Sequence, residues 1–107
     1  MRRSDVIGNL GTDGELKVTN SGTSVLNFSV AANGSRKEDE VEWVRCAMFG
    51  KRAESLAEYM KKGTKVFARG EWKIRRYQKD GQDRVSFEMN VDELELLGSK
   101  EKSDGNW

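Results

Sequence analysis

Apolar and polar residues alternate along two central stretches of the chain, and this alternation predicts β-strands. In the stretch 25–31 every second residue is apolar, which predicts one buried and one exposed strand face. The stretch 41–49 combines alternation with aromatic and β-branched residues, which favour pleated surfaces. We expect its core face to carry Val44, Cys46 and Met48, and its other face to carry Trp43, Arg45 and Phe49. The second face joins two aromatic rings to a cation, a combination suited to flat, negatively charged molecules.

A helix is predicted over residues 51–62, where apolar residues recur with helical spacing. Its apolar stripe consists of Ala53, Leu56, Ala57 and Met60. We expect Glu58 and Lys62 to form a favourable i,i+4 pair and Gly63 to provide a left-handed cap. We interpret this helix as a plug for the core rather than as a binding element.

A long hairpin is predicted from residues 64–77 and 84–97, because Asp80-Gly81 between them is a strong turn signal. A two-residue turn there brings apolar residues opposite each other on one face, in the pairs Ile74–Phe87 and Trp72–Met89. Trp72 is therefore expected in the core. The other face of the hairpin carries Lys73, Arg75 and Tyr77.

The first strand is expected at residues 6–10, and residues 15–18 are expected to continue it, so that these two stretches count as one strand segment. The result is five strand segments with the helix between the third and the fourth. Closure of so small a sheet removes exposed edges, so we predict an all-β fold with one short helix, a five-stranded OB-fold barrel. Residues 1–98 are expected to form this domain and residues 99–107 a short disordered tail, and the polar loop 33–40 is expected to be mobile.

Composition fits one soluble domain, and the position of its charges adds a further indication. The chain has 107 residues and no stretch of about 20 apolar ones, so no membrane association is expected. A single cysteine fits a reducing compartment, and we predict a cytoplasmic protein. The net charge of +1 divides into +8 over residues 43–79 and −7 over the rest. A basic face directed at a polyanion and scattered surface lysines both remain open explanations.

The residue types needed for catalysis are largely missing from the sequence. Without histidine and with one cysteine, the chain has no Ser-His-Asp triad and no zinc cluster, and we predict no catalytic residue, metal or cofactor. Asp92, Glu93 and Glu95 could serve a metal-assisted nuclease, but a solvated strand end is the favoured interpretation. Cys46 is expected to be a buried small hydrophobe.

Basic residues are interleaved with the exposed-face aromatic residues in two runs, 43–52 and 73–77. Single strands expose base faces that stack on aromatic rings, worth ~1–3 kcal/mol per base, while cations follow the phosphates. Recognition of a duplex needs a helix that enters a groove, and the predicted helix carries an apolar stripe instead. The pattern favours single-stranded nucleic acid, with core packing of the rings as the alternative.

Short motifs distributed over residues 3–98 resemble the bacterial-type single-stranded DNA-binding protein (SSB) family. They occur in order and at matching spacing: Ile7-Gly8-Asn9-Leu10-Gly11, Asn27-Phe28-Ser29, Glu42-Trp43, Phe49-Gly50-Lys51, Glu58-Tyr59-Met60-Lys61-Lys62-Gly63 and Asp80-Gly81-Gln82. The resemblance implies an OB-fold subunit that assembles as a homotetramer and wraps single-stranded DNA without sequence preference. It also implies a role in protecting exposed strands during replication, recombination and repair.

The resemblance further implies which residues bind DNA. The family's stacking aromatics correspond to Trp43, Phe49 and Tyr77. Its phosphate-contacting basic positions correspond to Arg3, Arg45, Lys51, Lys62, Lys73, Arg75 and Arg76. A further stacking tryptophan of the family is replaced by the stretch 35–37, where we expect Arg36 to contact the DNA backbone.

The remaining departures from the family concern assembly and partners. Ser4-Asp5 stands where the first strand is usually apolar, and Val44 stands at a common histidine position near the subunit interface. The acidic tip that recruits replication and repair proteins is reduced to one acid in the stretch 103–107. An alternative function is an OB-fold replication or primosome accessory, or an RNA-binding module, that acts mainly through protein contacts.

Overall fold

The computed structural model describes residues 2–32 and 42–99, which form six strands and one helix. The predicted loop 33–40, including Arg36, and the tail from residue 100 onward lie outside the described residues. The elements are β1 (Arg3–Leu10), β2 (Glu15–Val18), β3 (Ser24–Ala32), β4 (Glu42–Phe49), α1 (Lys51–Ala57), β5 (Thr64–Lys79) and β6 (Gln82–Ser99).

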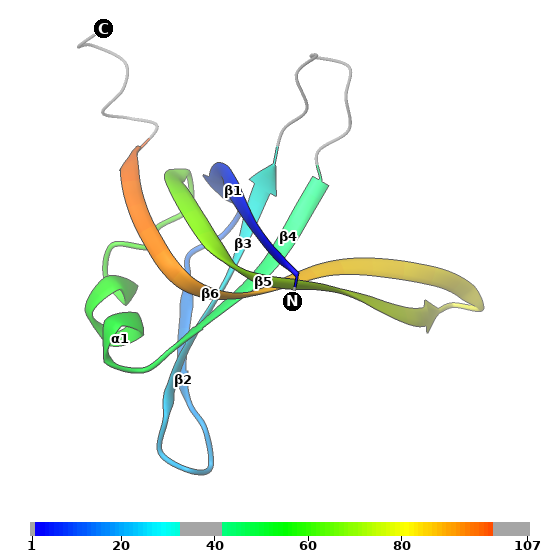
Figure 1. Cartoon of the computed structure of the whole chain (residues 1–107), viewed down its shortest axis with the longest axis horizontal. Coiled ribbons are helices and arrows are strands. Elements are labelled where there is room, and N and C mark those ends of the chain that lie inside the picture. The colour runs from blue at the N-terminus through cyan, green and yellow to red at the C-terminus, as the bar shows by residue number, and fades with distance from the viewer. Residues whose placement is uncertain (1, 33–41, 100–107) are drawn as a thin grey trace, which may run out of the picture.

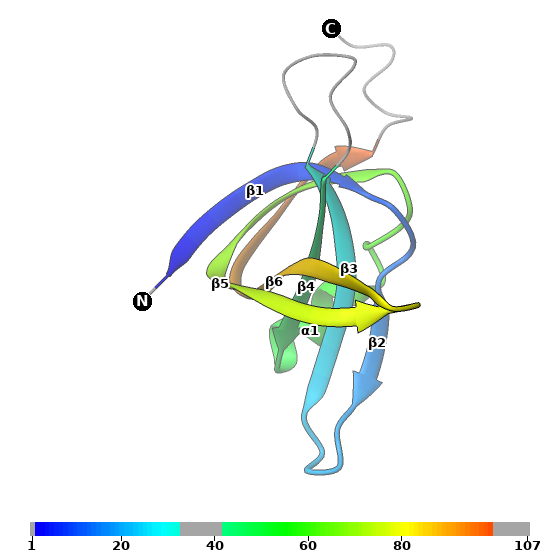
Figure 2. The same ribbon diagram turned by 90° about the vertical axis from the view of Figure 1, so that its right-hand side faces the viewer.

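The strands form one sheet that closes on itself (Figures 1 and 2). Their order is β1-β5-β6-β4-β3-β2, and a further pairing between β1 and β3 completes the ring. The pairs are antiparallel except that β4 runs parallel to β6. The predicted all-β barrel with a helix before the long hairpin is confirmed. The first predicted strand is divided into β1 and β2 by the turn at residues 11–14.

The β5–β6 hairpin has the register that the sequence predicts. Ile74 lies opposite Phe87, Trp72 opposite Met89, and the two-residue turn is at Asp80-Gly81. Both turn residues have positive φ (55° and 77°), as the commonest two-residue hairpin turn requires. The distal part of this hairpin, which we call the arm (residues 72–89), projects beyond the ring (Figure 1).

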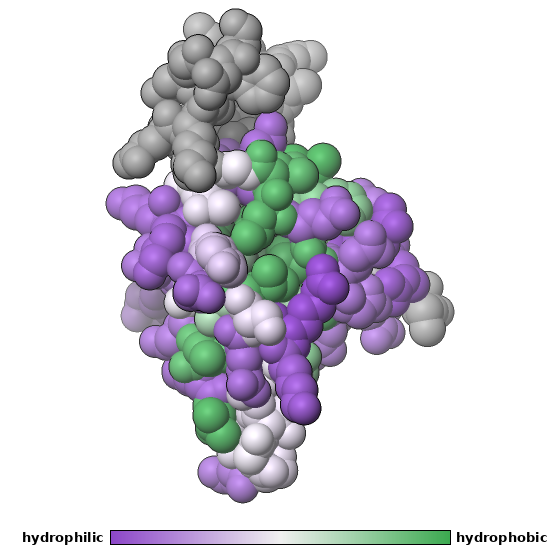
Figure 3. All heavy atoms as spheres, turned by 90° about the vertical axis from the view of Figure 1, so that its left-hand side faces the viewer, coloured by the Kyte–Doolittle hydropathy of each residue, from purple (hydrophilic) through white to green (hydrophobic). Residues whose placement is uncertain are grey.

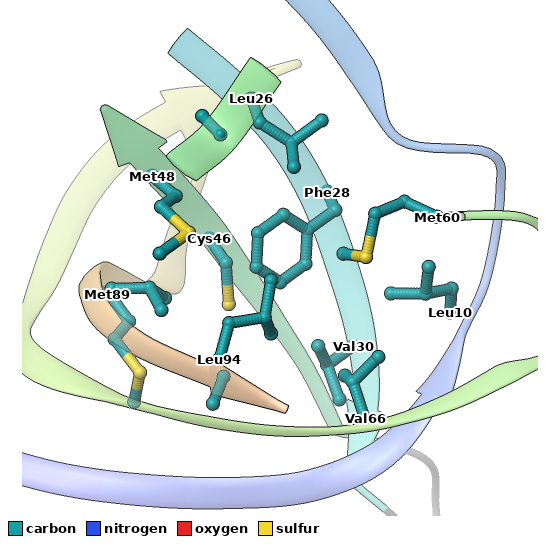
Figure 4. Packing of buried hydrophobic residues seen from close by; sticks show 13 residues of the cluster. Leu10, Leu26, Phe28, Val30, Cys46, Met48, Met60, Val66, Met89 and Leu94 are labelled. Atoms are coloured by element: carbon teal, nitrogen blue, oxygen red, sulfur yellow. The ribbon is translucent and has the colours of Figure 1, made fainter. Parts of the chain in front are cut away.

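The core fills the inside of the ring, and β1, β3, β4, β5 and β6 all contribute residues to it. The Phe28 ring lies in the middle, with Cys46 and Met48 of β4 on one side and Leu10 and Met60 on the other (Figure 4). Burial raises the pKa of the Cys46 thiol to about 12, so the thiol stays protonated at neutral pH, as expected of a small buried hydrophobe.

Trp72 lies at the margin of this core rather than inside it. Its side chain is half-buried and packs against the core cluster, and the Arg2 guanidinium carbon is 5.6 Å from its ring centroid. The arm begins at this point of β5, so fewer neighbouring elements are available to cover the ring. The prediction of a core tryptophan is therefore confirmed in part.

The helix is shorter than predicted. It ends at Ala57, so the expected i,i+4 pair of residues 58 and 62 is wrong. Gly63 has the expected left-handed conformation (φ 88°), but it lies in the turn before β5 and does not cap the helix. The apolar stripe faces the core: Ala53 and Met60 are fully buried, and Leu56 and Ala57 are partly buried and pack against the core cluster. Hydrogen bonds to the β1–β2 connection direct the chain away from the helix axis: Gly14 N–H donates to the Met60 carbonyl at 2.7 Å, and Gly63 N–H donates to the Leu10 carbonyl at 2.9 Å.

The surface on the side of α1 is mainly hydrophilic. A hydrophobic patch interrupts it in the upper half of the view, with hydrophilic side chains on both sides (Figure 3). Elsewhere, β2 exposes Leu16 and Val18. Among residues 2–32 and 42–99 we find no helix with the length and apolarity that crossing a membrane requires.

The burial of Met60 leads to a prediction about stability. Met60→Ala should lower the free energy of unfolding by about 2–5 kcal/mol, because it leaves a cavity where α1 meets the β1–β2 connection. The neighbouring Tyr59 is 56% exposed, and Tyr59→Ala should change stability by only about 0.5 kcal/mol. Urea unfolding followed by circular dichroism measures both. Equal losses in the two variants would contradict this role of Met60.

Candidate nucleic-acid interface

Strand β4 exposes an aromatic face. Trp43 is 49% exposed and Phe49 is 53% exposed, and the exposed Arg45 lies between them on the same face. The intervening residues Cys46 and Met48 are buried in the core. The alternation predicted from the sequence is confirmed, so these two rings are available to a ligand.

The Trp43 ring lies directly over the backbone of Gly11. A Cβ atom at Gly11 would be 2.3 Å from Cζ3 and 2.5 Å from Cη2 of the indole. Residue 11 follows the end of β1, where its N–H donates to the Ser29 carbonyl at 3.2 Å. The Trp43 ring can therefore lie this close to the barrel only because residue 11 has no side chain.

A hollow of about 880 Å³ opens beside Arg45 on the outer face of the barrel. Strand register explains its walls, because Ser29, Arg45, Glu88 and Lys73 lie in one row across β3, β4, β6 and β5. The charged lining residues balance in number: Arg45, Lys62 and Lys73 against Asp13, Glu15 and Glu88. Uncharged hydrogen-bonding groups come from Thr12, Asn27, Ser29 and Asn90. The hollow therefore offers donors and acceptors to a polar ligand as well as cations.

Lys62 reaches this hollow from the turn that follows α1. Its backbone N–H donates to Asp13 Oδ1 at 2.8 Å, which anchors the turn to the β1–β2 connection. The early end of the helix thus moves Lys62 from a predicted helical position to the rim of the hollow.

The arm carries a second aromatic site. Tyr77 is 39% exposed and shares its face with Lys73 and Arg75, as predicted. The Arg75 guanidinium carbon lies 5.8 Å from the Tyr77 ring centroid, and Arg75 Nη1 lies 3.7 Å from Glu88 Oε2. Tyr77 is therefore already in contact with a cation of its own chain.

Other predicted site residues lie apart from these two aromatic sites. Arg76 points to the opposite face of the arm, where it lies across from Val85. Arg3 is on β1 and donates to both carboxylate oxygens of Asp92, at 2.7 and 2.9 Å. Lys51 is the first residue of α1, two positions after Phe49. Contact of Arg3, Lys51 and Arg76 with nucleic acid stays a prediction.

The basic segment 43–79 does not form a single face. Arg52 donates to the Leu94 carbonyl at 3.1 Å. Arg69 forms ion pairs with Asp5 at 3.1 Å and with Glu93 at 3.9 Å. Part of the positive charge is therefore engaged in contacts within the fold, and Arg45, Lys62 and Lys73 are the cations of this segment that line the hollow.

Of the residues that line the hollow, sequence reasoning identified Arg45, Lys62 and Lys73 as site residues and missed the others, among them Asn27, Ser29, Glu88 and Asn90. The alternation of β3 predicts that Asn27 and Ser29 point outward, and this was a usable signal. The predicted hairpin register already places Glu88 opposite Lys73. Its position beside Arg45, and that of Asn90 beside Ala47, required the pairing of β4 with β6, which joins strands far apart in the sequence.

The carboxylates considered for metal-assisted cleavage have other partners. Asp92 pairs with Arg3 at 2.7 Å and Glu93 lies 3.9 Å from Arg69. In the part of the chain that the structure describes, no group of three or more histidine, cysteine, aspartate or glutamate side chains is arranged to hold a metal ion.

Comparisons with known proteins agree with this fold and surface. Residues 1–97 match the single-strand binding protein family. Two proteins named single-stranded DNA-binding protein, from Neisseria meningitidis serogroup A strain Z2491 and serogroup B strain MC58, are each 37% identical to the chain over 108 residues. These alignments cover 94% of this chain and 62% of each relative, so the chain spans about 62% of their length. The chain belongs to the single-strand binding protein family.

Proposed function

We propose that this protein binds single-stranded DNA without sequence preference and protects it during replication, recombination and repair. The observation that carries the proposal is the exposed face on which Trp43 and Phe49 flank Arg45, beside a hollow lined by further cations. Proteins of this family are DNA-binding proteins rather than enzymes.

Physical chemistry supports a single-stranded rather than a double-stranded ligand. Exposed rings offer stacking surfaces to unpaired bases, and each stacked base is worth ~1–3 kcal/mol. The helix α1 has seven residues and packs its apolar stripe against the core, so it offers no recognition helix for a major groove. Stacking on rings and contact with phosphates are both indifferent to base identity, which explains the absence of sequence preference.

The proposed roles follow the positions of the side chains. Trp43, Phe49 and Tyr77 stack bases, and the cations around them contact the sugar–phosphate backbone. The backbone-contacting set comprises Arg3, Arg36, Arg45, Lys51, Lys62, Lys73, Arg75 and Arg76. We assign Arg45, Lys62 and Lys73 the central contacts, because they line the hollow.

We further infer that the protein forms a homo-oligomer, and specifically a tetramer. Over Arg3–Gly8, one edge of β1 pairs with β5, and within the described residues no strand pairs with its other edge. Ile7 on this strand is 53% exposed and lies opposite Phe67 of β5. An unpaired edge next to exposed apolar side chains supports association with a second copy. We expect the protein to act in the cytoplasm in association with the nucleoid, where replication and repair proteins are candidate partners.

Removal of the Trp43 ring should weaken binding strongly. Trp43→Ala should raise the Kd for oligo(dT) about 5- to 150-fold, the range that corresponds to one stacked base. Fluorescence anisotropy of labelled oligo(dT) measures the Kd, and intrinsic tryptophan quenching reports the same event in the unmodified protein. Tyr59→Ala removes an equally exposed aromatic ring from the turn after α1 and should leave the Kd unchanged. Tight binding to a duplex without preference for single strands would contradict the proposed function.

The contact between Gly11 and Trp43 can be tested separately. Gly11→Ala should displace the indole ring, because its new Cβ atom would lie 2.3 Å from the ring. The displaced atoms belong to the end of an exposed side chain, so the melting temperature should change little while the Kd for oligo(dT) rises several-fold. An unchanged Kd would show that this ring position does not matter for binding.

The oligomer can be tested by native mass spectrometry. Ile7→Lys should shift the mass toward the monomer, because it places a charge on the apolar face beside the β1 edge. Val18→Lys makes the same change at another exposed aliphatic residue, on β2, and should leave the mass unchanged. A monomeric mass for the unmodified protein would refute the tetramer.

A further inference from the structure

Glu88 of β6 lies in the middle of the row that crosses Arg45 of β4 and Lys73 of β5. It is opposite Arg45 in the parallel pair with β4 and opposite Lys73 in the antiparallel pair with β5. Its Oε2 atom lies 3.7 Å from Arg75 Nη1. The Glu88 side chain is 22% exposed, whereas that of Arg75 is 61% exposed. The carboxylate is thus partly buried and pairs with Arg75, and its neighbours in the strand register are two further cations of the proposed binding surface.

Arg75 links this carboxylate to the stacking residue of the arm. Arg75 and Tyr77 are two positions apart on one strand, so they project from the same face. The guanidinium carbon is 5.8 Å from the Tyr77 ring centroid, within the range of a cation–π contact. One side chain therefore contacts both the carboxylate of Glu88 and the ring of Tyr77.

These contacts occupy groups that a nucleic acid strand would use. A phosphate competes with Glu88 for Arg75, since both are oxygen anions that pair with a guanidinium. A base competes with Arg75 for the face of Tyr77, since both interact with the same π surface. A strand that places a phosphate on Arg75 and a base on this face of Tyr77 replaces both contacts.

The other carboxylates of the hollow have different partners. Asp13 accepts the Lys62 backbone N–H at 2.8 Å, and Glu15 forms an ion pair with Lys17 at 3.2 Å. Their removal would disturb a turn or release a lysine of β2. Glu88 is the carboxylate of the hollow for which the structure records an ion pair to a cation of the arm.

We propose that Glu88 is an internal counter-ion that holds Arg75 over Tyr77 in the free protein and is displaced by the incoming strand. The inference rests on the proposed binding of single-stranded DNA and specifies how the site selects its ligand. A polynucleotide supplies a phosphate for Arg75 and a base for Tyr77 together, whereas inorganic phosphate supplies only the first. Glu88 thus lowers the affinity of the arm for all anions, and the Tyr77 ring favours those that also carry a base.

The experiment compares Glu88→Gln with the unmodified protein in oligo(dT) binding over a range of salt concentrations. Glutamine keeps the size and hydrogen-bonding capacity of the side chain but removes its charge. We expect the Kd at low salt to fall about fivefold, the factor that one unit charge about 4 Å away produces in water. The slope of log K against log salt should steepen by about 0.7, because one more cation becomes available to a phosphate of a single strand.

Two further variants make the test specific. Glu95→Gln removes the same charge from the same strand, but opposite Phe67 on another part of the barrel, and should leave both Kd and slope nearly unchanged. In an Arg75→Gln background, Glu88→Gln should lose at least half of its effect, because the competing pair is already absent.

The outcomes separate this inference from the proposed function. If the unmodified protein does not bind oligo(dT), the proposed function fails. If it binds but Glu88→Gln binds equally or more weakly while melting at the same temperature, the counter-ion role fails. An equal gain in Glu95→Gln, or an undiminished gain in the Arg75→Gln background, would also overturn the inference, since either result would indicate a general charge effect.

Discussion

The pairing of β4 with strands on both of its sides is the constraint on which the rest of this structure depends. Strand β4 is antiparallel to β3 and parallel to β6, so its position and direction are fixed at both edges. Successive side chains of a strand point to opposite faces, so this position places Cys46 and Met48 in the core and Trp43 and Phe49 on the outer surface. A slip by one residue would expose the core set and bury the aromatic face, so the same register stabilises the barrel and presents the binding surface.

Much of the fold could be predicted from the sequence because its signals are local. The alternation in β3 and β4 and the Asp80-Gly81 turn each depend on residues within one hairpin, and the register of the arm follows from them. The end of α1 could not be predicted in this way. The hydrogen bond from Lys62 N–H to Asp13 joins residues 49 positions apart, and it competes successfully with a helical pattern that continues past Ala57. Tertiary contacts commonly override such a short propensity signal.

In the candidate site, too, features that depend on one strand could be predicted from the sequence, and features that depend on the pairing of distant strands could not. Alternation within single strands was sufficient to predict the exposed rings and the face shared by Lys73, Arg75 and Tyr77. It could not predict the row in which Glu88 lies between Arg45 and Lys73, because that row needs the β4–β6 pairing. The contact of the Trp43 ring with Gly11 likewise joins segments far apart in the sequence, so no local pattern predicts it. What the sequence misses are therefore the neighbours of the predicted residues rather than the residues themselves.

The parallel β4–β6 pair also has a kinetic consequence. It joins Val44 to Phe87, 43 positions apart, so a large loop of chain must close before the ladder can form. The hairpins of the barrel can form by shorter closures, and we expect this long-range ladder to form after them. Since the hollow has Arg45 on one side of the ladder and Glu88 on the other, it does not exist in any partly folded state that lacks the pair. A ligand held there binds the closed barrel alone and stabilises it by mass action, so occupancy and completion of folding are thermodynamically linked.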